Sequence, residues 1–233
     1  MKVEYIIPFR DRGIDQLRHK NLMCVTDYWR ANGVHWPHVC TDGRAGDAQF
    51  NRSAAYNFGV RNHDADVYVF TESDMIVPKD QIDKAIEMAV ESPGLVVPFT
   101  LYCYLAPDDS ALVRADQIKA HTCSPVYTKE NGRSIGAVNV VSRETMEMVG
   151  KWDENFEGNW YDDDAMKRAF DVAAAKTRWV EGPAYHLYHM PGWKGEHLTD
   201  EDRAATKRNK KRYLKYRQAT TPEQIRKLTS GGS

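Results

Sequence analysis

Short apolar runs alternate along the chain with longer segments of helical spacing. The run Val3–Phe9 ends in charged residues and predicts a strand, and apolar residues at helical spacing follow over 14–31. The run Asp66–Thr71 lacks alternation, as strands buried on both faces of a parallel sheet do. Further strands are expected at Val34–Cys40, Leu95–Phe99 and Arg178–Val180, and helices at Phe50–Val60, Asp80–Glu91, Ser142–Val149, Asp162–Ala174 and Thr199–Arg217. This order predicts an α/β fold with a central, mostly parallel mixed sheet flanked by helices.

Two parts of the chain carry weaker signals. Residues 100–134 show little periodicity, and we expect either a loop-rich insertion with substrate contacts or plain irregular surface. The last four residues, from Ser230, are expected to fray. No repeat or proline-rich linker interrupts the chain, so we predict one compact domain over 1–197 and a basic helical extension over 198–233 that packs on it.

Composition narrows the class of protein. Of 233 residues, 42% are hydrophobic, which is enough for a core and excludes general disorder. The formal charge of −1 indicates no particular partner, and no apolar run reaches the ~18–20 residues of a membrane span, so no transmembrane anchor is expected. Four widely spaced cysteines form no Cys-x-x-Cys motif, and no signal peptide precedes the first strand. We therefore expect a cytoplasmic protein.

Two carboxylates follow the compact run at 66–71. Glu72 and Asp74 are separated by Ser73, which places acidic oxygens at the carboxyl edge of the predicted sheet, where open α/β folds bind ligands. Such oxygens suit Mg²⁺ or Mn²⁺, which neutralise a diphosphate. The alternative is a solvated turn with a helix-capping aspartate.

Two arginines follow the first strand. Arg10 and Arg12 lie in a strand-to-helix loop, where forked hydrogen bonds and the helix start can hold phosphate. A surface loop with salt bridges would have the same sequence.

Three adjacent carboxylates, Asp162–Asp164, begin a predicted helix. One of them could act as general base toward an acceptor hydroxyl, and the flat rings of Trp160 and Tyr161 beside them suit a sugar or a base. The alternative is simple stabilisation by the helix dipole.

Two histidines lie three residues apart near the end of the predicted sheet. His186 and His189 could meet a metal, especially together with Asp74. Without such a partner, a histidine pair is more often structural.

Taken in order, these segments resemble the GT-A glycosyltransferases, most closely the β-1,4-galactosyltransferase family and its bacterial and viral relatives. The resemblance runs from about Val3 to His189. The segments that carry it are Ile6–Arg12, Phe50–Arg52 with Asn57 and Gly59, Val69–Ile76, Gly136–Phe156, Asp162–Asp164 with Arg168, and His186-x-x-His189. The chain departs from the family's pattern at Glu72 (usually aspartate), His186 (usually methionine) and Tyr161 (usually acidic).

The resemblance implies a GT-A (Rossmann-like) domain that transfers a sugar from a nucleotide-diphosphate sugar, which we expect to be UDP-linked. It also implies inversion at the anomeric carbon and a requirement for Mn²⁺ or Mg²⁺. It implies a catalytic base at Asp162, with Asp163 next, and a metal held by Asp74, His186 and His189. Acceptor contacts are expected at Trp160, Tyr161 and Trp193. Donor contacts are expected at Pro8, Phe9, Arg10, Arg12, Asn51, Arg52, Asn57, Glu72 and Ser73.

The acceptor is suggested by residues 203–217, which are strongly basic with interleaved tyrosines. A polyanion would suit this segment, and DNA with hydroxymethylated bases in a phage-infected or bacterial cell is one candidate. An anionic glycan, a membrane surface, a protein acceptor, or no binding role at all would also fit. Two rival classes are a nucleotidyltransferase and a non-catalytic module that binds nucleotide sugars.

Overall fold

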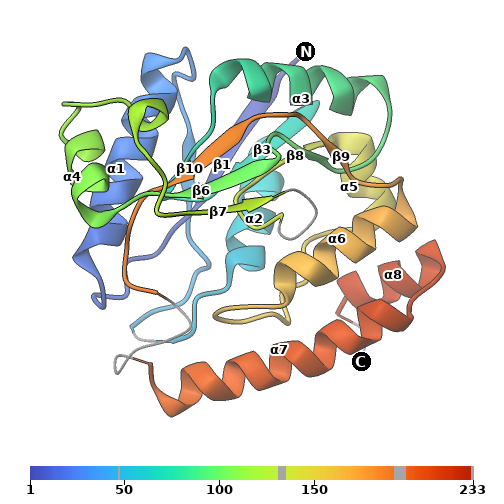
Figure 1. Cartoon of the computed structure of the whole chain (residues 1–233). Helices are drawn as coiled ribbons and strands as arrows, with labels where there is room; N and C mark the ends of the chain where they lie inside the picture. Colours follow the sequence, from blue (N-terminus) through green and yellow to red (C-terminus); the bar gives the residue numbers. More distant parts are fainter. Residues whose placement is uncertain (47, 131–134, 192–197, 232–233) are drawn as a thin grey trace.

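The computed structural model describes residues 1–46, 48–130, 135–191 and 198–231, and its strands form two sheets (Figure 1). The larger sheet has the order β2-β1-β3-β8-β5-β9, and the smaller has the order β4-β10-β6-β7. The larger sheet consists of β1 (Val3–Pro8), β2 (His38–Cys40), β3 (Val67–Thr71), β5 (Val96–Val97), β8 (Val138–Ser142) and β9 (Arg178–Trp179). The smaller consists of β4 (Met75–Ile76), β6 (Leu101–Tyr104), β7 (Tyr127–Glu130) and β10 (Pro183–His186).

Strand β3 forms the centre of the larger sheet. All five of its residues are buried, it runs parallel to β1 and antiparallel to β8, and its carboxyl end leads directly to β4 of the smaller sheet. The predicted mixed sheet flanked by helices is confirmed. The transition from β3 to β4 positions residues 72–74 where the two sheets meet.

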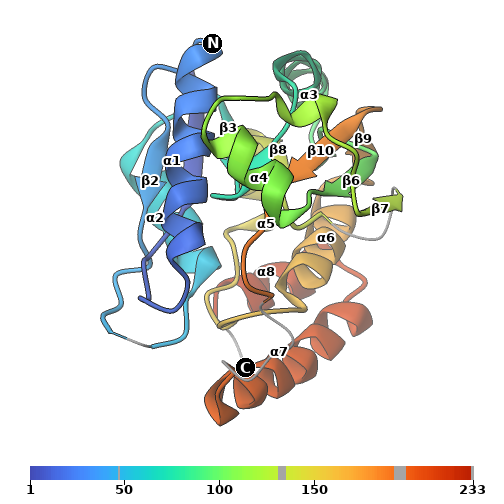
Figure 2. The same ribbon diagram turned by 60° about the vertical axis from the view of Figure 1, so that its left-hand side comes forward.

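The helices surround the two sheets (Figure 2). α1 lies against α4, α8 lies against α5 and α6, and α7 runs along the outside of α6. None of the described helices is long and apolar enough to span a bilayer. The helices are α1 (Gln16–Ala31), α2 (Arg52–Asn62), α3 (Lys79–Glu91), α4 (Pro107–Arg114), α5 (Arg143–Val149), α6 (Asp162–Ala173), α7 (Asp200–Gln218) and α8 (Pro222–Thr229), with a 3₁₀ turn at Ala120–Thr122.

Local chemistry sets the starts of several helices. The side chains of Asp15 and Ser142 accept hydrogen bonds from backbone N–H groups in the first turns of α1 and α5. Thr199 and Asp202 form a reciprocal capping box at the start of α7. Asn51 caps α2, so this helix begins at Arg52 rather than at the predicted Phe50.

Other predicted boundaries are wrong. The strand expected at Val34–Cys40 is confined to His38–Cys40, because the N–H of Val34 still bonds to the last turn of α1. Residues 100–130 are not irregular: they form β6, α4, the 3₁₀ turn and β7. Three of the four residues of β7 are exposed at the edge of its sheet, so its sequence shows no alternation. Strands β4, β8 and β10 and helix α8 were also not predicted from the sequence.

A close approach of backbone to side chain joins α2 to the sheet. A Cβ atom at Gly59 would lie 2.6 Å from Ile6 Cγ2, so only glycine allows α2 to pack this closely on β1. Aromatic rings fill the core behind it, with Tyr56 4.8 Å and Trp152 5.2 Å from the ring centroid of Phe70. The packing fixes α2, which carries Arg52 at its first position.

Candidate active site

Three predicted metal ligands from distant parts of the chain come together. Asp74 lies in the turn between β3 and β4, His186 ends β10, and His189 follows three residues later. His189 Nε2 lies 3.0 Å and His186 Nε2 3.8 Å from Asp74 Oδ2. The pairing of His186 with Met75 across β10 and β4 brings the two segments into register. One ligand atom from each residue lies within 4.8 Å of the others.

The protonation pattern of this cluster suits a divalent cation. Burial lowers the pKa of His186 to about 4, which leaves a neutral imidazole at pH 7. Burial opposes ionisation of Asp74, yet the two imidazoles hold the pKa of its carboxyl well below the usual range. Asp74 Oδ1 is buried and has no hydrogen-bond partner among the described residues. A buried, ionised carboxylate with an unpartnered oxygen beside two imidazoles fits a metal ion.

A hydrogen bond orients the second imidazole. His189 Nδ1 lies 2.8 Å from the carbonyl oxygen of Met190, so this nitrogen carries the proton and donates it to that carbonyl. The other ring nitrogen, Nε2, faces Asp74 Oδ2, where a bound cation would accept its lone pair. Metal-binding histidines are commonly oriented in this way.

Side chains at the start of α1, within α1 and within α4 hold the segment that carries His189, a role that no sequence pattern indicates. Asp15 Oδ2 accepts a hydrogen bond of 2.6 Å from the N–H of Met190, and Asn21 Nδ2 donates to the carbonyl of Tyr188 at 3.3 Å. Ser110 of α4 accepts from the N–H of Tyr188 at 2.9 Å. A capping signal identifies Asp15 at the start of α1, but its second oxygen has a long-range partner that no local pattern reveals.

A second polar cluster surrounds Arg52. Its guanidinium Nε donates to Asp162 Oδ2 at 3.1 Å, and its other nitrogens contact Glu72, Asp162 and Asp163. The first turn of α6 and the end of β3 are thus joined through one arginine. The predicted catalytic and donor-binding residues of these segments lie together, and their individual roles stay predictions.

Of the two aspartates that contact Arg52, Asp163 has the more exposed side chain, although most of it is still enclosed by protein. Its side chain is 29% exposed, compared with 9% for Asp162. Burial raises the pKa of Asp163 to about 7, with Arg52 opposing and Asp162 and Asp164 adding to the rise. Gly136 approaches it so closely that a Cβ there would lie 2.1 Å from Asp163 Oδ2. A carboxylate with a pKa near 7 can exchange protons at neutral pH.

A cavity lies beside the loop that follows β1. Pro8, Phe9, Arg10 and Arg12 line it together with Ser73. The structure gives the Arg10 guanidinium other partners, because it bonds to Asp42 at 2.9 Å and to the carbonyls of Gly46 and Ala48. Arg12 lies 3.8 Å from Asp202 of α7. The grip of these arginines on phosphate stays a prediction.

Two further predicted donor residues face the loop before α6. Asn51 Nδ2 donates to the carbonyl of Glu154 at 2.7 Å, and Asn57 bonds to both the carbonyl and the N–H of Trp152. Both amides are buried and bind protein backbone. Their part in donor binding remains a prediction.

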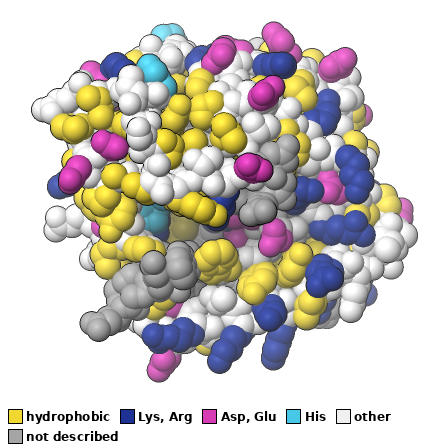
Figure 3. Space-filling model, in the orientation of Figure 1, with side chains coloured by type: hydrophobic (Ala, Val, Ile, Leu, Met, Phe, Trp, Pro, Cys, Tyr) yellow, Lys and Arg dark blue, Asp and Glu magenta, His cyan; other side chains and the backbone are white. Residues whose placement is uncertain are grey.

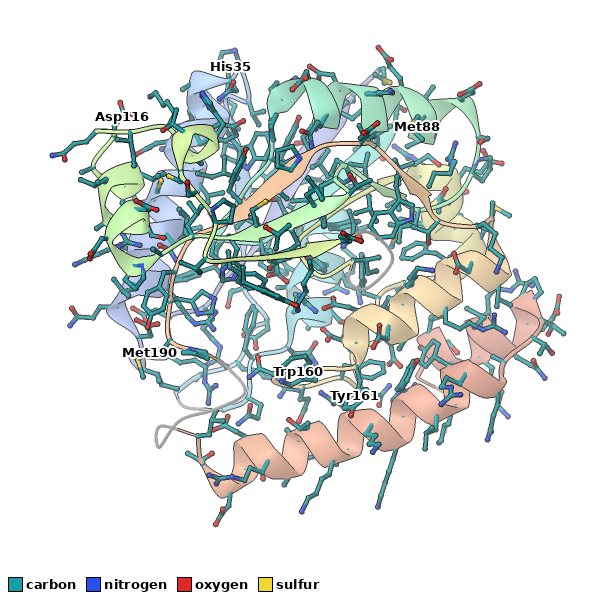
Figure 4. All side chains as sticks on the ribbon, in the orientation of Figure 1. His35, Met88, Asp116, Trp160, Tyr161 and Met190 are labelled. Carbon is teal, nitrogen blue, oxygen red and sulfur yellow. The ribbon has the colours of Figure 1, made fainter. Side chains whose placement is uncertain are left out.

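The aromatic residues before α6 have an unusual backbone. Trp160 and Tyr161 both have positive φ values, 77° and 70°, and Trp160 is 49% exposed. Figure 4 shows the two side chains in the space next to α7, where Tyr161 stacks on Tyr213 at a centroid distance of 5.7 Å. Asn209 of α7 holds this loop through the carbonyls of residues 157, 159 and 160. Trp193, the third predicted acceptor residue, lies outside the described residues.

The basic segment on α7 divides into two sets. Arg203, Arg208 and Arg212 pair with carboxylates of the protein. A second set is exposed, with no ion pair to other described residues, and Figure 3 shows dark blue side chains gathered along this edge. This set, the outer cations of α7, consists of Lys207, Lys210, Lys211, Lys215 and Arg217.

Comparison with solved structures identifies the fold that carries this cluster of residues. No protein-family model matches the sequence, and no curated protein matches it. The catalytic domain of Drosophila β1,4-galactosyltransferase 7, solved with xylobiose, matches with a TM-score of 0.52 and 16% identity, over 95% of this chain and 83% of that chain. The chain has the GT-A fold. PcManGT, a mannosyltransferase from Pyrobaculum calidifontis solved with GDP-Man and Mn²⁺, matches with a TM-score of 0.51 and 14% identity, over 98% of this chain and 68% of that chain. The GT-A resemblance expected from the motifs is confirmed at the level of the fold.

Proposed function

We propose that this protein is a metal-dependent glycosyltransferase that moves a sugar from a nucleotide-diphosphate sugar, UDP-linked, to an acceptor hydroxyl. One observation carries the proposal. Three consecutive residues serve three neighbouring sites: Glu72 contacts Arg52, Ser73 lines the cavity at the first loop, and Asp74 joins the two histidines. The cavity, the candidate metal ligands and the acid cluster are thus adjacent through a single turn, and this arrangement supports transfer from a nucleotide sugar.

The metal site supports this proposal through its donor set. Asp74, His186 and His189 would hold Mn²⁺ or Mg²⁺, and the mannosyltransferase of the same fold was solved with Mn²⁺ and GDP-Man. When bound, such an ion supplies positive charge to the diphosphate that leaves the sugar. The protein itself contributes the cavity beside Phe9 and Arg12, which would receive the nucleotide next to this ion.

The acid cluster would take the proton of the acceptor hydroxyl. We assign this role to the Asp162–Asp163 pair. The resemblance favours Asp162, whereas the exposure of Asp163 and its pKa of about 7 favour Asp163. Arg52 holds both carboxylates in place. Attack by the hydroxyl on the face opposite the leaving group would invert the anomeric centre, as the resemblance implies.

Hydrolysis of nucleotide sugars tests the proposal without knowledge of the acceptor, since water can replace the hydroxyl. UDP-sugars and GDP-sugars are incubated with the protein and Mn²⁺, and release of the nucleoside diphosphate is measured. Release that disappears with EDTA and in Asp74→Asn supports a transferase. Binding of UDP-sugar without any release would identify a binding module, and pyrophosphate formed from a nucleoside triphosphate and a sugar phosphate would identify a nucleotidyltransferase.

The outer cations of α7 suggest the acceptor. We propose DNA with hydroxymethylated bases, because five exposed cations on one helix form a track for phosphates. A hydroxymethyl group also supplies the hydroxyl that transfer needs. The cytoplasmic location and the division of the chain at residue 197 stay predictions of the sequence.

Binding to duplexes with 5-hydroxymethylcytosine, measured by fluorescence anisotropy at several salt concentrations, tests this acceptor. Affinity should fall steeply with salt, and replacing Lys207, Lys210, Lys211 and Lys215 with Gln should make the slope of log K against log salt shallower by about 3.6. Glucosylated or otherwise modified base in the product is expected from the wild type. No binding, or binding that ignores salt, would leave a glycan or protein hydroxyl as the acceptor.

A further inference from the structure

A wall of aromatic side chains from strands β6 and β7 stands next to the predicted metal ligands. The ring of Tyr104 lies 5.0 Å from the ring of His186, and Tyr102 lies 4.7 Å from Tyr104. Tyr127 extends the row, with its centroid 5.8 Å from that of Tyr104. None of these three tyrosines has a role in the site described above.

Strand register places these side chains on one face of the smaller sheet. Tyr104 pairs with His186 in the neighbouring parallel strand and with Tyr127 in the antiparallel strand β7. Directly paired residues project from the same face of a sheet. Because neighbouring strands are about 4.8 Å apart, β7 carries its side chains about 10 Å beyond His186, roughly the length of a sugar ring with its linkage.

A cation lies across this wall. Lys129 pairs with Tyr102 in the register of β6 and β7, and its Nζ lies 5.4 Å and 6.0 Å from the ring centroids of Tyr104 and Tyr102. The lysine is half-buried although its neighbours in β7 are exposed. None of the described carboxylates forms an ion pair with it. The tyrosine faces hold the ammonium group in place and leave its charge available to a ligand.

We propose that Tyr104, Tyr127 and Lys129 form an acceptor subsite that takes a flat ring joined to a unit with an anionic group, a carboxylate or a phosphate. The inference rests on the proposed glycosyl transfer and specifies the chemistry of the acceptor beside the metal. Tyr127, 53% exposed at the outer end of the row, offers its ring face to the acceptor. Lys129 selects the charged acceptor over a neutral one of the same shape.

Binding of two matched probes tests this subsite. Phenyl β-D-glucuronide and phenyl β-D-glucoside differ by a carboxylate in place of a hydroxymethyl group. Each is titrated by calorimetry into protein saturated with UDP and Mn²⁺. The glucuronide should bind the wild type about fivefold more tightly than the glucoside, as one half-buried ion pair allows. Lys129→Met should abolish the difference, whereas Lys129→Arg should keep it.

Two further variants separate charge from stacking. Lys84→Met, which removes an exposed lysine of α3, should bind both probes as the wild type does. Tyr127→Ala should weaken both probes by a similar factor, because the ring contact does not depend on the charge. Equal binding of the two probes to the wild type, or an unchanged preference in Lys129→Met, would overturn the proposal.

The donor sugar is the other possible source of the anionic group. Hydrolysis of UDP-glucuronate and UDP-glucose is therefore compared in the wild type and in Lys129→Met. The acceptor assignment predicts the same ratio of rates in both proteins, and a preference for UDP-glucuronate that disappears in Lys129→Met would refute it. If UDP and Mn²⁺ do not bind the wild type, the proposed transferase function is refuted. Titration of the two glycosides into the free protein then still tests the proposed acceptor subsite.

Discussion

Gly136→Ala places a single methyl group against the carboxylate that we assign to proton transfer. The new Cβ would lie 2.1 Å from Oδ2 and 2.7 Å from Cγ of Asp163, well inside ordinary van der Waals contact. The oxygen must therefore move by about 1 Å to reach a normal separation. Gly136 is not among the residues with positive φ, so alanine introduces no backbone strain there.

A displacement of this size costs about a hundredfold in rate when it moves a reacting group. We expect Gly136→Ala to hydrolyse the nucleotide sugar about a hundredfold more slowly than the wild type at saturating Mn²⁺. Affinity for UDP and Mn²⁺ should be unchanged, because the three atoms nearest to the new methyl group all belong to Asp163. Release of UDP gives the rate, and calorimetry gives the affinity.

Gly59→Ala provides the matched control. Its methyl group would lie 2.6 Å from a side-chain carbon of Ile6 in the core, so the loss should appear as a lower midpoint of urea denaturation. Gly136→Ala should have a denaturation midpoint close to that of the wild type. A wild-type rate of hydrolysis in Gly136→Ala would refute the catalytic placement of Asp163.

Three other changes test the remaining parts of the site. A protonated Asp163 cannot accept a proton, so the rate of hydrolysis at saturating Mn²⁺ should fall about tenfold per pH unit below its pKa of about 7 and level off above it. Asp163→Asn should be slow and should show no such step. An unchanged step in Asp163→Asn would assign the titration to another group. His189→Ala should weaken Mn²⁺ binding to the UDP complex about tenfold or more, while His35→Ala, an exposed histidine remote from the cluster, should leave it unchanged. Asn209→Ala removes the side chain that holds the 157–160 loop and should lower the free energy of unfolding by about 2 kcal/mol in urea titrations. A loss no larger than that of the exposed control Lys210→Ala would contradict its anchoring role.

The central part of the fold could be predicted because its signals are local. The buried strand β3 has an uninterrupted apolar sequence, and the polar residues 72–74 follow it directly. The position of Asp74 at the sheet edge followed from this strand alone. Its meeting with His186 and His189 needed the resemblance, since more than a hundred residues separate them in the sequence.

Other parts of the site depend on contacts that no local pattern encodes. The four-residue strands β6 and β7 have too few residues to show a period. The position of the tyrosines beside His186 follows only from the pairing of β6 with β10. The basic character of α7 was evident, but ion pairs with Asp153, Glu157 and the helix's own acidic start decide which cations face solvent. The sequence shows the charges, and only the packing shows which of them are already paired.

The metal site is tested most directly by a crystal structure with UDP and Mn²⁺, using the anomalous signal of manganese to locate the ion. The proposal predicts one Mn²⁺ bonded to Asp74, His186 and His189, with the diphosphate of UDP on the same ion and the nucleotide beside Phe9 and Arg12. Manganese bound elsewhere while these three side chains remain without an ion, or UDP bound away from the cavity of the first loop, would contradict it.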